Sequence, residues 1–132
     1  MHDGRFLTAL ISGVPVVAAP EEVDMANAQE LELALLEAAP TGPGTLVADM
    51  TLTRFCDSSG IRTLLAAHQR AQADGGELLL VVADAAVLRV FTIIGVDRLI
   101  PNFTSLEQAL AAAAAATTAD RGHREREAMT CR

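Results

Sequence analysis

The sequence contains no tryptophan, no tyrosine and no lysine, and it has only two cysteines. Aromatic residues make up 3% of the chain and hydrophobic residues 51%, so its core must be built from aliphatic side chains. Cys56 lies mid-chain and Cys131 in a polar stretch near the end. Two such cysteines do not make a disulfide framework, so we expect a cytoplasmic, reducing location. We expect no signal peptide at residues 1–5 and no membrane helix, because no apolar run reaches roughly 18 residues.

Positive charge is also scarce. The chain has 10 basic residues, all arginine, against 17 acidic ones, which gives a formal net charge of −7 and a pI of about 4.8. A diffuse acidic surface repels phosphate backbones, so direct binding to nucleic acid is not expected. No membrane partner is expected either.

Strand-like and helix-like patterns alternate along the chain with short connections. Apolar runs predict strands at residues 6–12, 16–19, 45–49, 77–83 and 99–103. Helical spacing predicts helices over 24–39, 59–73, 84–94 and after 104 or 105, with Asp24 and Asp84 as N-cap candidates. This alternation predicts an α/β fold with a mixed central sheet of four to five strands against about four helices. The domain should span 1–116, with 117–132 a disordered tail.

The most informative stretch is residues 46–61, where an apolar strand leads into Asp57-Ser58-Ser59-Gly60 and then a helix. A serine at a helix N-terminus lies near unpaired backbone N–H groups, where negative charge is favoured. A phosphate there would be locally stabilised. From spacing alone, however, both serines more often serve as helix caps, and Asp57 is as readily a cap or turn residue.

Other polar residues have structural explanations as well. Asp24 alone is more often an N-cap than a functional acid, and Arg62 is best explained as a solvated side chain. His68 falls on the apolar face of its predicted helix and should be a packed histidine, because no Cys/His/Asp cluster has metal-ligand spacing. Cys56 should be a small buried hydrophobe and Phe91 a core residue. No metal and no cofactor are expected.

Three segments, in this order, resemble the STAS-type anti-sigma factor antagonist family. The first is a strand ending in Asp49 followed by Asp57-Ser58-Ser59-Gly60. The second is a helix closing on Gly75-Gly76 before the strand 78–82, and the third is the helix 87–97, which carries a Phe and ends in Gly. Residues 105–110 also resemble the family's last helix, so the resemblance covers about 6–114.

The resemblance implies a bacterial, cytoplasmic regulator that is not an enzyme. Its partner would be an anti-sigma factor of the serine-kinase type, which binds the ATP and phosphorylates Ser59. The unphosphorylated chain would sequester the kinase and free the sigma factor, and the phosphorylated chain would release it. The family's acidic turn residue maps to Asp24. The implied partner surface comprises Asp24, Asp57, Ser58, Ser59, Gly60 and Arg62 on a monomer or weak dimer.

The sequence departs from the family pattern at Glu21, Cys56 and Arg62, and two other functions stay open. The chain could be the soluble STAS component of a lipid or anion transport assembly, docking on a nucleotide-binding subunit. It could also be a small enzyme with Ser59 or Cys56 as nucleophile. That needs a nearby general base, and none of the three histidines is an obvious candidate.

Overall fold

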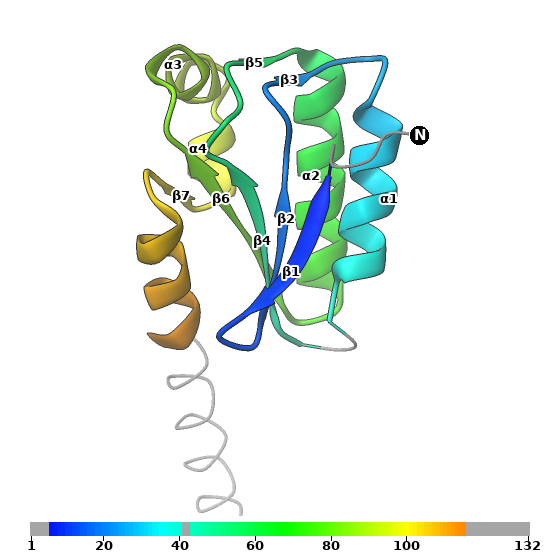
Figure 1. The fold of residues 1–132 in the computed structure, drawn as a ribbon, viewed down its shortest axis with the longest axis vertical. Helices are drawn as coiled ribbons and strands as arrows, with labels where there is room; N and C mark the ends of the chain where they lie inside the picture. The colour runs from blue at the N-terminus through cyan, green and yellow to red at the C-terminus, as the bar shows by residue number, and fades with distance from the viewer. Residues whose placement is uncertain (1–5, 41–42, 116–132) are drawn as a thin grey trace, which may run out of the picture.

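The structure, a computed structural model, describes residues 6–40 and 43–115 (Figure 1). The expected tail at 117–132 and Cys131 lie outside the described residues. In chain order the elements are β1 (Leu7–Ile11), β2 (Val14–Ala18), β3 (Glu22–Val23), α1 (Ala28–Ala38), β4 (Thr45–Met50), β5 (Phe55–Cys56), α2 (Ser58–Ala73), β6 (Glu77–Val82), α3 (Ala85–Ile94), α4 (Val96–Leu99) and β7 (Asn102–Phe103). A further helix occupies residues 106–115.

The main sheet has five strands in the order β1-β2-β4-β6-β7, and β3 pairs with β5 in a separate two-stranded sheet. β1 and β2 form an antiparallel hairpin, whereas the β2–β4, β4–β6 and β6–β7 pairs are parallel. Ser12 and Gly13, the two residues of the hairpin loop, both have positive φ, at 53° and 80°, as a type I′ turn requires. The mixed α/β fold expected from the sequence is confirmed.

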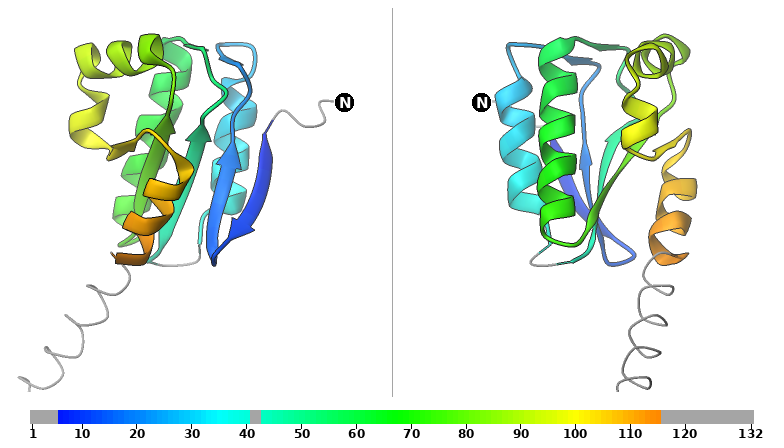
Figure 2. Two further views of the ribbon diagram at one scale, coloured as in Figure 1. Left: turned by 60° about the vertical axis from the view of Figure 1, so that its left-hand side comes forward. Right: turned by 180° about the vertical axis from the view of Figure 1, so that it is seen from behind.

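Helices cover both faces of this sheet. The larger core cluster lies under α1, α2 and α3 and includes Leu46, Leu80 and the fully buried Phe91. The smaller cluster joins Val47 and Leu79 to the helix at residues 106–115, which lies on the opposite face (Figure 2). Because alternate residues of a strand point to opposite faces, a central strand covered on both sides must be apolar throughout. This explains the continuous apolar run of β6.

Two of the expected element boundaries are wrong. The helix expected over 24–39 begins at Ala28, because residues 25–27 form turns before it. The strand expected over 99–103 is reduced to Asn102–Phe103 at the sheet edge, since residues 96–99 close a helical turn instead. That turn follows Gly95, whose φ of 96° ends α3 in a left-handed conformation.

The parallel strands place the segments of interest together. β2, β4 and β6 run in the same direction, so their carboxyl ends meet at one edge of the sheet. The chain leaves β2 towards β3, β4 towards β5 and α2, and β6 towards α3. These segments therefore gather at one end of the molecule, the upper end in Figure 1. Open parallel sheets commonly carry their functional residues at this edge. Among the described residues, no helix combines the length and hydropathy needed to cross a bilayer.

Candidate functional site

Two short parallel strands hold the Asp24 turn against the serine segment. Glu22 of β3 pairs with Phe55 of β5. The N–H groups of Arg54 and Phe55 both donate to the carbonyl of Glu21, at 2.7 and 3.2 Å, and the N–H of Asp57 donates to the carbonyl of Val23 at 3.0 Å. Strands of two residues are too short to show a hydrophobic period, so no pattern in the sequence indicates this pair.

Asp57 is the residue on which this arrangement converges. Its Oδ1 accepts the backbone N–H groups of Ser59 at 2.9 Å and Gly60 at 3.1 Å, so Asp57 is the N-cap of α2. Its Oδ2 accepts the N–H of Met25 at 3.2 Å. Of the alternatives open from the sequence, the cap is therefore Asp57 and neither Ser58 nor Ser59. One carboxylate fixes the helix start and the turn before α1.

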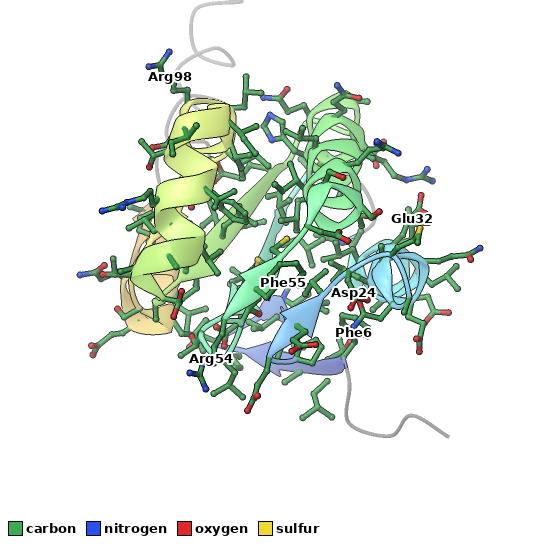
Figure 3. All side chains as sticks on the ribbon, turned by 90° about the horizontal axis from the view of Figure 1, so that it is seen from above. Phe6, Asp24, Glu32, Arg54, Phe55 and Arg98 are labelled. Carbon is green, nitrogen blue, oxygen red and sulfur yellow. The ribbon has the colours of Figure 1, made fainter. Side chains whose placement is uncertain are left out.

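Asp24 lies in that turn and is not the N-cap of α1. Its Oδ1 accepts the N–H of Ala26 at 2.9 Å, while Asn27 occupies the N-cap position without a capping hydrogen bond. The Asn27 side chain is used elsewhere, because it accepts from the Asp24 N–H and donates to the Glu22 carbonyl. Asp24 and Asp57 thus bind neighbouring amides, those of Ala26 and Met25, and lie at one site. Figure 3 looks down on this end of the molecule and labels Asp24 and Phe55.

The two serines begin α2 on this surface. Ser58 is exposed and Ser59 is partly buried, and neither hydroxyl makes a hydrogen bond within the part of the chain that the structure describes. Their hydroxyls are therefore not committed to holding the fold. The amides of Ser59 and Gly60, which a phosphate would be expected to use, already donate to Asp57.

Gly60 has a steric role at the same place. A Cβ there would lie 2.7 Å from Cys56 Sγ and 2.7 Å from Val23 Cγ1, well inside van der Waals contact. Only glycine lets the first turn of α2 approach β3 and β5 this closely, since any Cβ would overpack the contact. The serines are thereby held close to the β3–β5 pair.

The structure also locates the other residues that the sequence analysis considered. Arg62 is exposed on α2, four residues after Ser58 and so on the same side of the helix. His68 is buried on the inner face of α2, as expected for a packed histidine, and its Nδ1 has no hydrogen-bond partner among residues 6–40 and 43–115. Asp49 accepts the N–H of Thr51 at 3.0 Å and closes the turn after β4. Among the described residues, no group of three His, Cys, Asp or Glu side chains could hold a metal ion.

Cys56 ends β5 just before the serine segment, and it is buried against Gly60. Burial, with a smaller contribution from the neighbouring charge of Asp57, raises the pKa of its thiol to about 12. The thiolate is the nucleophilic form of cysteine, and it is nearly absent at neutral pH when the pKa is this high. The expectation of a small buried hydrophobe is confirmed, and Cys56 is not poised for nucleophilic chemistry.

Comparison with known proteins decides the family. Residues 6–109 match the STAS domain family. This chain belongs to that family. A relative from Bordetella bronchiseptica, BtrV, is named as an anti-sigma factor antagonist and is 32% identical over 77% of this chain and 88% of its own length. The crystal structure of an anti-sigma factor antagonist from Mycobacterium paratuberculosis is 30% identical, with a TM-score of 0.74, over 82% of this chain and 92% of that one.

Two further structures share the fold at lower identity. The Bacillus cell fate determinant SpoIIAA in its phosphorylated form is 20% identical, with a TM-score of 0.59 over 80% of this chain and 96% of that one. The murine anion transporter Slc26a9 is 24% identical, with a TM-score of 0.66, but the match covers 80% of this chain and only 18% of the transporter. The resemblance to STAS-type anti-sigma factor antagonists inferred from the sequence is confirmed.

The two N-cap aspartates offer a test of what Asp57 contributes. Removing either cap should cost about 1 kcal/mol of unfolding free energy. Within the described part of the chain, Asp84 accepts two amides, those of Ala86 and Val87, at the start of its own helix. Asp57→Ala should therefore lose more stability than Asp84→Ala, because it also frees the Met25 amide. Urea unfolding of both variants measures this, and equal losses would contradict the bridging role of Asp57.

The raised pKa of Cys56 makes a second prediction. In a Cys131→Ser background, the native thiol should react slowly with a disulfide reagent at pH 8 and rapidly in denaturant. The unfolded thiol ionises near pH 9 and the native thiol near pH 12, so between these values the unfolded state loses its proton first. This contribution to stability is therefore complete below pH 9 and decreases as pH rises towards 12. Reaction at the same rate with and without denaturant would contradict the burial.

Proposed function

We propose that this chain is a cytoplasmic bacterial anti-sigma factor antagonist that regulates sigma-factor-dependent transcription and is switched by phosphorylation of Ser59. Its partner is an anti-sigma factor with serine-kinase activity, which supplies the ATP. The observation that carries the proposal is the placement of Ser59. Its hydroxyl makes no hydrogen bond among the described residues and lies on the first turn of α2, next to the Asp57 carboxylate. The chain itself acts by binding and not as an enzyme.

The chemistry of the site favours a switch in binding over a switch in folding. Phosphorylation adds about −1.5 to −2 charges and three acceptor oxygens. The nearest helix amides, those of Ser59 and Gly60, already donate to Asp57, so a phosphate on Ser59 lies beside a carboxylate and finds these two amides engaged. Ser59 is not a core residue, so the fold tolerates the new charge in solvent. A partner surface fitted to a neutral hydroxyl would have to bury it, at a cost of several kcal/mol.

The relatives support the same role. BtrV and the Mycobacterium paratuberculosis protein are both named as anti-sigma factor antagonists at 30% identity or more. SpoIIAA, whose fold this chain shares, exists in both an unphosphorylated and a phosphorylated form. Asp24, Asp57, Ser58, Ser59, Gly60 and Arg62 form the proposed partner surface, with Ser59 as acceptor.

The second candidate function is that of a component of a transport assembly, since a domain of this fold forms a small part of the anion transporter Slc26a9. In that case the chain would dock on a nucleotide-binding subunit of a transport assembly. Affinity purification from native cells separates the two, because a transport component should bring down a membrane ATPase. An anti-sigma factor antagonist should instead bring down a serine kinase, together with the other proteins that regulate the same sigma factor.

Mass spectrometry tests the modification directly. After incubation with candidate anti-sigma serine kinases and ATP, the phosphate should map to Ser59 in the wild type and in Ser58→Ala, and should be absent from Ser59→Ala. Ser58→Ala is the matched control, because Ser58 is the more exposed of the two hydroxyls. A phosphate on Ser58, or on neither serine with a kinase that binds the chain, would contradict the assignment.

The charge itself should weaken binding. We expect Ser59→Asp to bind the kinase about 100-fold more weakly than the wild type. Burying an uncompensated charge in the interface lowers the binding free energy by about 3 kcal/mol. Ser59→Ala should bind within a few-fold of the wild type, and both variants should keep its melting temperature to within a few degrees. Titration calorimetry and thermal unfolding measure the two quantities. Wild-type affinity in Ser59→Asp would refute the mechanism.

A further inference from the structure

The outward side of α3 is apolar where a surface helix is ordinarily polar. Val90, Ile93 and Ile94 are all exposed, and Ile93 has 76% of its surface accessible. The opposite side buries Val87 and Phe91 in the core. A helix that is apolar on nearly every side is ordinarily buried on every side, so the exposed side of α3 has the composition of a covered surface.

This surface adjoins the serine site. α3 follows directly from the carboxyl end of β6, and it contacts β5. β5 carries the exposed Phe55 and leads at once into Asp57. Seen from above in Figure 3, β5 and β3 run between α3 on one side and α1 and α2 on the other. A partner seated over Ser59 therefore has α3 as its neighbour across β5.

The charges beside the apolar residues indicate what kind of surface fits. Arg89 is the only charged residue of α3, and Arg98 follows in α4, and both are exposed. The carboxylate of Asp84 accepts two amides of α3, and that of Asp97 accepts the Thr92 hydroxyl. A complementary surface is thus apolar with carboxylates at its rim. A second copy of the chain would present the same arginines, so it is the poorer fit.

Resting on the proposed function, we infer that Val90 and Ile93 on α3, with Phe55 on β5, form a second docking surface for the serine kinase that modifies Ser59. Apolar anchors of this kind supply affinity, whereas the serine site supplies the switch. The surface persists after phosphorylation, so the charge on Ser59 acts against an otherwise favourable contact. A few fully desolvated residues near the centre of an interface ordinarily carry most of its binding energy.

The test is a double variant, Val90→Gln/Ile93→Gln, with Leu10→Gln as its control. Glutamine is a good helix former, so α3 should persist, which circular dichroism and the melting temperature verify. Leu10 is 72% exposed, nearly as much as Ile93. It lies in β1, next to the hairpin turn and so at the opposite end of the sheet from Ser59. Calorimetry would use the kinase that phosphorylates Ser59, loaded with a non-hydrolysable ATP analogue.

We expect the double variant to bind at least tenfold more weakly and Leu10→Gln to bind within twofold of the wild type. Wild-type affinity in the double variant would overturn the second docking surface and leave the proposed function intact. A wild type that neither binds nor is phosphorylated by any anti-sigma serine kinase would overturn both. Sedimentation showing a wild-type dimer that the double variant abolishes, with kinase binding unchanged, would assign α3 to a second copy and overturn the inference.

Discussion

A single carboxylate, that of Asp57, ties the two halves of the serine site together. It accepts two amides at the start of α2 and one from the Met25 turn, which lies 32 residues earlier in the chain. Without it, the β3–β5 pair would still align the segments, but the helix start and the turn would each keep unsatisfied amides at the surface. Both segments of the surface that a partner would meet, the Met25 turn and the start of α2, depend on this group. Asp24 keeps its place through the same turn, so both carboxylates of the site are fixed by backbone amides.

The same group determines what a phosphate would experience. A helix N-terminus attracts anions through its unpaired amides. Here the amides of Ser59 and Gly60 already donate to Asp57. The attraction for a phosphate that the sequence predicts is therefore largely used by the Asp57 carboxylate. A phosphate on Ser59 would be a second anion at a site that already holds one. The arrangement suits a residue that must be neutral when docked.

How far the sequence predicted this structure depends on the length of each signal. The covered strand β6, the capped helix α3 and the mixed sheet all followed from patterns several residues long. The β3–β5 pair did not, because two-residue strands have no period. The helix expected to begin at Asp24 begins four residues later, at Ala28, because the Asn27 side chain forms its hydrogen bonds with the preceding turn. Propensity could nominate Asp57 as a cap, but its bond to Met25 is a tertiary contact that no local pattern contains.

Gly60 and α3 show two different origins for the residues at this end of the molecule. The glycine exists because a Cβ would strike Cys56 and Val23, so packing alone explains it. The exposed isoleucines of α3 have no such explanation, since the core is complete without them. The chain has a formal net charge of −7, yet an apolar side of α3 flanked by Arg89 and Arg98 lies beside its serine site. Packing of the described core does not require that composition, whereas contact with a partner that covers it would.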